Sequence, residues 1–293
     1  MPLVGTGTLA ATAAAEGRGL GAFNVIQLEH ITAIVAAAEE TGCPVVLQIS
    51  ENTVRYHGAL RPLARAALSA AEDAQVAVSV HLDHIVSPSL AEEAVALGVP
   101  SVMYDGAALP YAENVAATAA LAERCRRRGV WVEAELGEVG GKDGAHAPGV
   151  RTDPGEAVAF TAATGVDGLA VAVGTSHAML TRDAAPDFAL IRALRAAVPV
   201  PLVLHGSSGV GDAGLVEAVA AGMTKINIST HLNSRFTKAV RDDLTAHPGS
   251  VDPRRYLGAG RDAVTAETAR LLRLLNRPRA ALAVSATEPA AAL

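Results

Sequence analysis

Short apolar runs alternate with longer alanine-rich segments along most of the chain. The runs are nearly continuous in apolar residues, many of them valine or isoleucine, which is typical of parallel strands buried on both faces. The segments between them carry charges on one side, which is typical of helices that cover a sheet. The predicted strands are residues 21–25, 45–49, 76–82, 101–104, 130–136, 168–173, 201–204 and 224–228.

The longer segments carry helix signals at their ends. Asp153 before Pro154 predicts an N-cap followed by proline at the first helical position, and Gly98 and Gly165 stand where helices would end. The predicted helices are residues 27–41, 60–73, 89–97, 111–128, 154–164, 187–197, 212–221 and 231–244. Eight successive β-α units predict an α/β protein with a single (β/α)8 (TIM) barrel.

The alternative fold is a doubly wound open sheet. Such a sheet would have fewer units and a GxGxxG turn after its first strand, where this chain has Asn24-Val25-Ile26-Gln27. No linker interrupts the alternation, so residues 1–276 are predicted to form the barrel domain and residues 277–293 a flexible tail. Residues 137–152 contain several glycines and predict a long lid or binding loop.

Composition and charge exclude several functions. The 293 residues carry a formal net charge of −6, and the short basic run at 126–128 is typical of a helix end, so nucleic-acid binding is not expected. Cys43 and Cys125 lie far apart without CxxC spacing, which argues against a disulfide framework. Neither a signal peptide nor a transmembrane segment is recognisable. We therefore expect a soluble cytoplasmic protein that does not bind membranes.

Polar residues gather where the predicted strands end. In a TIM barrel the carboxyl ends of all strands share one face, and that face holds the active site. The polar positions are Asn24, Ser50, Asp83, His84, Asp105, Glu133, Glu135, His177, residues 205–209 and residues 227–230. The sequence therefore predicts a polar site at this mouth of the barrel.

Three histidines, His84, His177 and His205, follow the third, sixth and seventh strands. Each alone is more often a hydrogen-bonded structural histidine, but three on one rim fit a catalytic zinc site with an open coordination position. Asp83, beside His84, is either an acceptor for a histidine N–H or a general acid/base. His81 is either a supporting partner of such a site or a core residue.

Glycine and serine residues follow the seventh and eighth strands. Their turns can present backbone N–H groups to a phosphate. TIM barrels commonly bind phosphate after these two strands. Their position therefore favours a phosphate-binding site at this end of the barrel.

The chain resembles the class II fructose- and tagatose-bisphosphate aldolases over residues 8–275. The matching stretches are GAFNV, VVLQIS, VSVHLDH, SVMYDG, VEAELGEVGG, AVGTSH, LVLHGSSG and KINIST, in the family's order. The resemblance implies a cytoplasmic lyase of carbohydrate metabolism such as glycolysis, assembled as a homodimer or homotetramer. It would cleave a ketose 1,6-bisphosphate to dihydroxyacetone phosphate and an aldehyde phosphate.

The resemblance also implies roles for individual residues. His84, His177 and His205 would hold one catalytic Zn²⁺, and Asp105 and Glu135 would line an alternative site for a second divalent or monovalent cation. Asp83 would take the C4 hydroxyl proton during cleavage and return it during condensation. The residues implied to bind substrate are Asn24, Ser50, Ala178, Gly206, Ser207, Ser208, Asn227, Ile228, Ser229 and Thr230.

Two positions depart from the family's pattern. Asp143 stands where the family has a loop glutamate that protonates the carbanion, and it is one methylene shorter. Either the loop closes slightly further so that Asp143 takes that role, or another group serves. Ala178 follows His177 where the family commonly has glycine, and its Cβ would narrow the approach of a phosphate. The substrate stays open between fructose 1,6-bisphosphate, tagatose 1,6-bisphosphate and another phosphorylated keto-sugar or sugar acid.

Three other functions stay open. A Schiff-base aldolase would need a lysine at the mouth, and Lys225 is predicted to lie deeper, two residues before Asn227. A metal-dependent hydrolase would usually have an HxH pair on its first strand, where this chain has Phe23-Asn24-Val25. A non-catalytic metal-binding barrel would fit the altered positions 143 and 178. The native metal is open as well.

Overall fold

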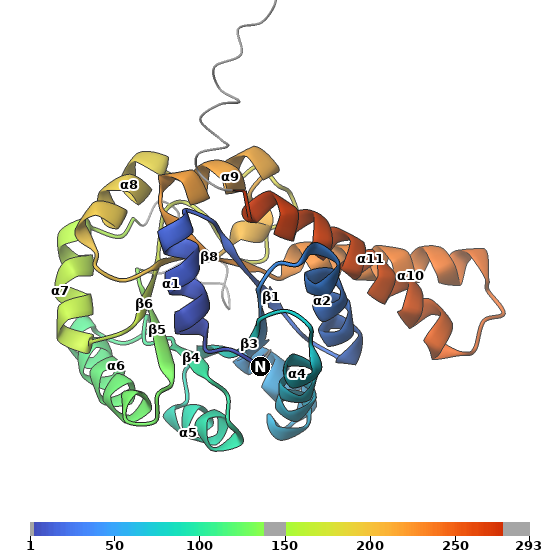
Figure 1. Cartoon of the computed structure of the whole chain (residues 1–293), viewed down its shortest axis with the longest axis horizontal. Coiled ribbons are helices and arrows are strands. Elements are labelled where there is room, and N and C mark those ends of the chain that lie inside the picture. Colours follow the sequence, from blue (N-terminus) through green and yellow to red (C-terminus); the bar gives the residue numbers. More distant parts are fainter. Residues whose placement is uncertain (1–2, 138–150, 278–293) are drawn as a thin grey trace, which may run out of the picture.

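Eight parallel strands close into a barrel in chain order, with β8 beside β1 (Figure 1). The computed structural model describes residues 3–137 and 151–277, and the barrel lies within these ranges. The strands are β1 (Leu20–Asn24), β2 (Val45–Ser50), β3 (Val78–Ile85), β4 (Ser101–Tyr104), β5 (Trp131–Leu136), β6 (Gly168–Val171), β7 (Leu202–Leu204) and β8 (Met223–Ile228). The predicted single TIM barrel is confirmed.

Helices follow each strand on the outside of the barrel. The barrel helices are α2 (Leu28–Thr41), α3 (Glu51–His57), α4 (Arg61–Asp73), α5 (Pro88–Leu97), α6 (Tyr111–Arg126), α7 (Pro154–Thr164), α8 (Phe188–Ala197), a 3-10 turn η1 (Ser207–Gly209), α9 (Asp212–Ala221) and α10 (Thr230–Ala246). Helices α1 (Thr6–Glu16) and α11 (Pro253–Leu275) flank this set. The sequence pattern missed α1, α3 and α11, and the predicted third strand ended at residue 82, three residues too early.

Helix α1 covers the amino-terminal end of the barrel (Figure 1). The Thr6 hydroxyl reaches into the barrel and lies 2.7 Å from Ser79 Oγ and 2.6 Å from Ser101 Oγ. A small apolar cluster around Leu9 and Ala13 packs against β1 and β2 below it. Because α1 covers this end, a ligand can approach the barrel interior from the carboxyl ends of the strands.

The main core fills the layer between the strands and the surrounding helices. Alanine dominates the helix faces in this layer, and Ala33, Ala37 and Ala38 of α2 are fully buried. Their small side chains let the helix approach strand residues such as Phe23 and Leu47, which are also fully buried. Each large apolar side chain buried in this way contributes about 1.5–3 kcal/mol. The packing holds the strand ends, and hence the site, in fixed positions.

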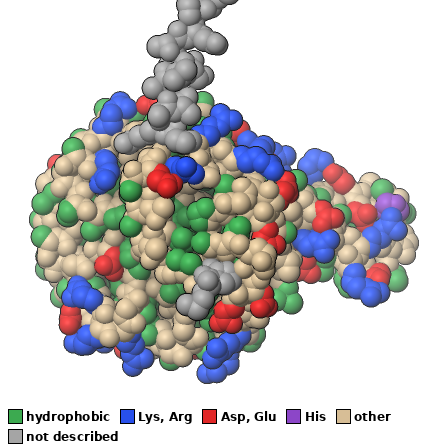
Figure 2. Space-filling view, viewed as in Figure 1, with side chains coloured by type: hydrophobic (Ala, Val, Ile, Leu, Met, Phe, Trp, Pro, Cys, Tyr) green, Lys and Arg blue, Asp and Glu red, His purple; other side chains and the backbone are tan. Residues whose placement is uncertain are grey.

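Helices α10 and α11 form a hairpin that projects from the barrel (Figure 1). Leu232 is the buried residue of α10, whereas the buried residues of α11 lie between Gly260 and Leu275. On the face seen in Figure 2, basic and acidic side chains are interspersed. Among the described helices, none is long and apolar enough to cross a bilayer. Residues 278–293 of the predicted tail lie outside the described ranges.

Candidate active site

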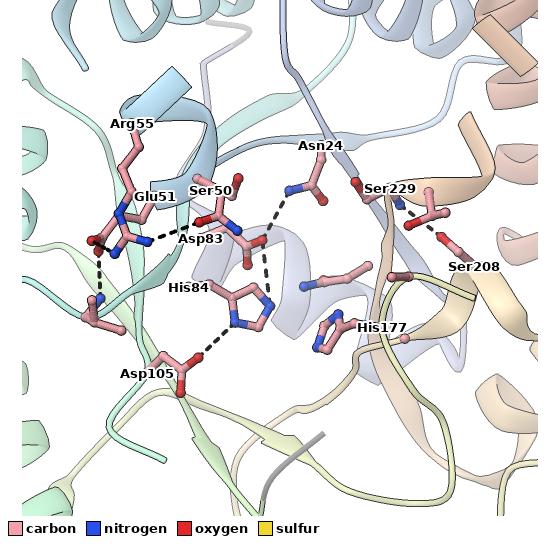
Figure 3. A pocket seen from close by; sticks show the side chains of 16 residues that line it. Asn24, Ser50, Glu51, Arg55, Asp83, His84, Asp105, His177, Ser208 and Ser229 are labelled. Carbon is pink, nitrogen blue, oxygen red and sulfur yellow. Dashed lines mark hydrogen bonds and ion pairs between the residues drawn. The ribbon is translucent and has the colours of Figure 1, made fainter. Parts of the chain in front are cut away.

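A cavity of about 340 Å³ opens at the carboxyl ends of the strands (Figure 3). It lies where the sequence predicted the polar mouth of the barrel. Its lining is mainly polar or charged. The lining residues are Asn24, Ser50, Glu51, Asn52, Arg55, Asp83, His84, Val86, Asp105, His177, Ala178, Gly206, Ser208, Asn227, Ser229 and Thr230.

Asp83 and His84 are consecutive residues of β3, yet both line the cavity. Neighbouring residues of a regular strand point to opposite faces. Here the pairing of β3 with β4 shifts register between Leu82 and Ile85, and His84 has a φ of 51°, in the left-handed region. A bulge of this kind re-aims a side chain. It explains how a carboxylate and an imidazole that are adjacent in sequence reach the same site.

Four side chains form a compact set of potential metal donors. His84, Glu135, His177 and His205 each bring one ligand atom to within 4.8 Å of the others. The His84 ring centre lies 5.0 Å from that of His177 and 4.6 Å from that of His205. Imidazole nitrogens and a carboxylate oxygen are donors that zinc accepts, and three protein ligands with an open position are typical of catalytic zinc. The residues present therefore fit such an ion.

Carboxylates fix the orientation of two of these rings. His84 Nδ1 lies 3.2 Å from Asp105 Oδ2, and its Nε2 lies 4.0 Å from Asp83 Oδ2. His205 lies between two carboxylates, with Nδ1 2.9 Å from Glu135 Oε2 and Nε2 3.0 Å from Glu133 Oε1. Such outer contacts set the tautomer and angle of a metal-binding histidine. Asp105 thus contacts His84, a predicted metal ligand, although Asp105 is not one of the four potential metal donors.

The site has a negative electrostatic character. Burial alone would lower the pKa of His205, but its hydrogen bonds with Glu133 and Glu135 outweigh burial and raise that pKa to about 9. Burial would raise the pKa of Glu133, but the Lys225 ammonium and the bond with His205 hold it well below its usual range. Two buried carboxylates therefore flank one imidazole, and that of Glu133 stays ionised. A cation is the ligand that this arrangement favours.

Two amide side chains hold the carboxylate of Asp83 in place. Asn24 Nδ2 donates to Asp83 Oδ2 at 3.2 Å, and Gln48 Nε2 donates to Asn24 Oδ1 at 3.1 Å. Asp83 Oδ1 is buried and has no hydrogen-bond partner within residues 3–137 and 151–277. Burial would raise the pKa of this carboxyl, but His84, Lys225 and His205 outweigh burial and lower the pKa to about 2. The carboxylate can therefore accept a proton from a ligand that enters the cavity.

The turn after β7 and the start of α10 form one end of the cavity. Gly206 has a φ of 66°, and a Cβ there would lie 2.6 Å from the backbone oxygen of Ser176, so only glycine fits. Ala178 has a φ of 56°, so this alanine adopts the left-handed backbone conformation that favours glycine. Ser208 Oγ accepts hydrogen bonds from the backbone N–H groups of Ser229, at 3.2 Å, and His231, at 3.3 Å. The helix start and its glycine turn suit an anionic group.

Helix α3 forms the opposite end of the cavity in Figure 3. Ser50 Oγ accepts from the backbone N–H of Thr53 at 3.2 Å and caps the helix. Glu51 accepts from the Arg55 guanidinium at 2.6 Å and from the backbone N–H of Val86 at 2.8 Å. Arg55 is thereby fixed at the rim with its side chain more than half exposed. The sequence pattern missed Glu51, Asn52 and Arg55, although Ser50 at the end of β2 was a visible N-cap signal.

Most residues predicted for the site lie at this cavity or directly beneath it. Glu135 and His205 lie below the cavity floor, within the donor set. Ser207 and Ile228 are buried and do not line the cavity; Ser207 Oγ donates to the backbone oxygen of Asn227 instead. Asp143 lies outside the described residues. Every other predicted metal, substrate or proton-transfer residue lines the cavity wall.

Two further predicted residues lie deeper. Lys225 is fully buried inside the barrel, as its place before Asn227 indicated. His81 is also fully buried, with Nδ1 2.8 Å from Ser101 Oγ and Nε2 4.0 Å from Glu133 Oε2. Lys225 therefore does not reach the mouth, where a Schiff-base lysine would be needed.

Comparison with known proteins gives matches over nearly the whole chain. The family model for class-II fructose-bisphosphate aldolase matches residues 4–278. A Bacillus subtilis (strain 168) protein named "Probable fructose-bisphosphate aldolase" is 38% identical over 268 residues, covering 90% of this chain and 94% of its own. A Geobacillus stearothermophilus "Fructose-bisphosphate aldolase" is 39% identical over 251 residues, which cover 84% of this chain and 88% of that protein. The crystal structure of the YdjI aldolase from Escherichia coli K12 superposes with a TM-score of 0.82 at 30% identity, covering 93% and 97%.

Proposed function

The chain belongs to the class-II fructose-bisphosphate aldolase family and is a carbon–carbon lyase, and from this premise we propose that it is zinc-dependent and acts on ketose 1,6-bisphosphates. The substrate would be of the fructose or tagatose type. Cleavage would release dihydroxyacetone phosphate and an aldehyde phosphate. One observation carries the proposal: the four-residue donor set lies at or just beneath the cavity that Asp83 lines, and Asp83 Oδ1 has no hydrogen-bond partner in the described part of the chain.

Aldolases of this family are generally metal-dependent, and we propose that His84, His177 and His205 hold the ion. A bound Zn²⁺ would supply Lewis-acid polarisation of the substrate's ketone oxygen. Three nitrogen donors favour zinc over magnesium or calcium, which prefer oxygen. Glu135 and Asp105 contact His205 and His84 and are proposed to line a second cation position.

Asp83 is proposed to be the acid/base at C4. Its Oδ1, which has no hydrogen-bond partner among the described residues, would take the C4 hydroxyl proton as the C3–C4 bond breaks and return it during condensation. Asn24 holds the other oxygen, so the carboxylate keeps one orientation through both directions. Protonation of C3 after cleavage is assigned to Asp143, which lies outside the described residues.

The two ends of the cavity are proposed to bind the two phosphates. The turn at Gly206, the backbone at Ala178 and the start of α10 would hold the phosphate of the dihydroxyacetone half. Asn227, whose Nδ2 is buried and has no partner in the described ranges, would donate to a substrate oxygen. Arg55 would pair with the phosphate of the aldehyde half, because a guanidinium on the rim suits a phosphate.

A second substrate class fits the same site. The Cβ of Ala178, at a φ of 56°, occupies space where glycine would let a phosphate approach. An aldolase of this family acting on another phosphorylated keto-sugar or sugar acid is therefore the alternative. Arg55 would bind a carboxylate as readily as a phosphate. This residue therefore does not discriminate between a ketose bisphosphate and a phosphorylated sugar acid.

We further propose a cytoplasmic homodimer or homotetramer that takes part in carbohydrate metabolism. The α10–α11 hairpin supports this assembly because it projects from the barrel, with one buried residue in α10 (Figure 1). A projecting hairpin of this kind offers a surface for a second copy of the chain. Sedimentation velocity would test the assembly: a single monomeric species at micromolar concentration would contradict it.

Cleavage of a panel of ketose bisphosphates, with and without a chelator, would test the function. Wild type is expected to release dihydroxyacetone phosphate from at least one member. The chelator and the substitution His205→Ala are both expected to abolish the release. Zinc-loaded protein that cleaves no member would favour the sugar-acid substrates or a non-catalytic barrel.

A further inference from the structure

Lys225 is a lysine fully buried inside the barrel. A charged ammonium in a protein interior is stable only if it is paired and hydrogen-bonded. Its Nζ donates to Glu133 Oε2 at 2.9 Å and to Asn227 Oδ1 at 2.9 Å. Neither Lys225 nor Glu133 lines the cavity. Both acceptors are nevertheless next to the site or part of it: Glu133 contacts His205, and Asn227 lines the cavity.

The first connection runs through Glu133 to His205. Glu133 uses its two oxygens separately: Oε2 accepts from Lys225, and Oε1 lies 3.0 Å from His205 Nε2. The other nitrogen, Nδ1, faces Glu135, which belongs to the same donor set as His205. A carboxylate fixed on Nε2 keeps a proton on that nitrogen, so Nδ1 is the nitrogen that would bind an ion in exchange for its contact with Glu135.

The second connection runs to Asn227, which lines the cavity. Either end of an amide can face a binding site, and its hydrogen bonds decide which. Because Lys225 donates to Oδ1, the Nδ2 group must point away from the ammonium. Nδ2 is buried without a hydrogen-bond partner in the described part of the chain. The ammonium therefore presents the amide donor to a ligand.

We propose that Lys225 and Glu133 form a positioning pair that orients a metal-binding histidine and a substrate-binding amide together. Glu133 fixes His205 with Nδ1 toward the other donors, and Lys225 fixes Asn227 with Nδ2 toward the cavity. The inference rests on the proposed function, because it assigns His205 to the metal and Asn227 to the substrate. Neither positioning residue touches the ligand itself.

A purely structural pair is the competing explanation. A buried ion pair can often be replaced by apolar residues of similar volume without loss of stability. If Lys225 and Glu133 only neutralise each other, a neutral replacement of both should leave the site unchanged. If they position His205 and Asn227, the same replacement should keep the fold and damage the site.

Two charge-neutral double variants separate the two connections. Lys225→Met/Glu133→Met removes both, whereas Lys225→Met/Glu133→Gln keeps an oxygen that can accept from His205. The dissociation constant for Co²⁺ is measured by optical titration of metal-stripped protein. The dissociation constant for dihydroxyacetone phosphate is measured by calorimetry on zinc-saturated protein. Lys238→Met, which breaks an exposed pair with Asp242 on α10, is the matched control.

The Met/Met variant is expected to bind Co²⁺ about 10–100-fold more weakly than wild type, the usual effect of removing an outer partner of a ligand. The Met/Gln variant should keep Co²⁺ binding close to wild type. Both should bind dihydroxyacetone phosphate roughly 10-fold more weakly, because the amide of Asn227 loses its orientation. Lys238→Met should change neither constant.

The proposal is overturned if both double variants bind Co²⁺ and dihydroxyacetone phosphate as wild type does. It is also overturned if neither variant folds, because the pair would then serve the fold. Wild type that binds neither Co²⁺ nor dihydroxyacetone phosphate would overturn the proposed function as well. If wild type binds Co²⁺ and dihydroxyacetone phosphate and the double variants have the same dissociation constants, only the positioning role of Lys225 and Glu133 is refuted.

Discussion

The substitution Asp83→Asn separates the two proton transfers of the proposed reaction. Asparagine has nearly the same shape and keeps an oxygen that can accept from Asn24, which donates to Asp83 Oδ2 at 3.2 Å. The cost to folding should be roughly 2 kcal/mol, because charged neighbours that lower the pKa of Asp83 to about 2 stabilise its carboxylate in the folded protein. The variant loses the ability of Oδ1 to take up a proton, together with the negative charge beside His84, Lys225 and His205.

Loss of a positioned acid/base lowers a rate about 10²–10⁴-fold, which corresponds to roughly 3–5 kcal/mol of transition-state stabilisation. Asp83→Asn should show this loss in kcat for cleavage of the ketose bisphosphate. Exchange of a carbon-bound proton of dihydroxyacetone phosphate with solvent deuterium involves no C4 oxygen. That exchange should persist at close to the wild-type rate.

Proton exchange is followed by NMR and cleavage by a coupled assay for dihydroxyacetone phosphate. His205→Ala serves as the comparison, since loss of a metal ligand should stop both reactions. Asp83→Asn protein that binds Co²⁺ normally but loses both reactions equally would refute the assignment of Asp83 to C4. Retention of full cleavage activity would refute it as well.

Three further substitutions give separate predictions. Burial would raise the pKa of Glu267, but His231 and Arg270 outweigh burial and lower the pKa to about 2. The contribution of this carboxylate to the stability of the fold is complete above pH about 4.5 and is lost as pH falls toward 2. After allowance for the partial exposure of Arg270, Glu267→Gln should lower the free energy of unfolding by about 2 kcal/mol at pH 7 and by much less near pH 2.5; a difference in urea unfolding that does not change with pH would contradict this. Ala178→Gly should relieve a left-handed alanine, leave the melting temperature unchanged or higher, and lower KM for the phosphorylated substrate; a raised KM would count against phosphate binding at this backbone. Arg55→Met should raise KM for a ketose 1,6-bisphosphate about 10-fold without weakening dihydroxyacetone phosphate binding; equal weakening of both would place Arg55 at the other end of the cavity.

The barrel could be predicted because its strands are buried on both faces and so form continuous apolar runs. The same alternation did not predict α1, because this helix precedes the first strand and belongs to no β-α unit. It could not find α3 either, because seven residues give too few turns to show a helical period.

The positions of the site residues were predictable from strand ends, but their contacts were not. Alternation along β3 would have placed Asp83 and His84 on opposite faces, and only the bulge between Leu82 and Ile85 brings both to the cavity. The pairing of Lys225 with Glu133 depends on which strands face each other across the barrel. Sequence spacing within one strand carries no such information.

Restoration of activity by zinc tests the central claim most directly. Metal-stripped protein is titrated with Zn²⁺ while release of dihydroxyacetone phosphate from the best ketose bisphosphate is followed. The account predicts no release before addition, and a rate that rises in proportion to zinc and levels off at one ion per chain. Full activity in the stripped protein, or no response to zinc or any other divalent ion, would contradict the account.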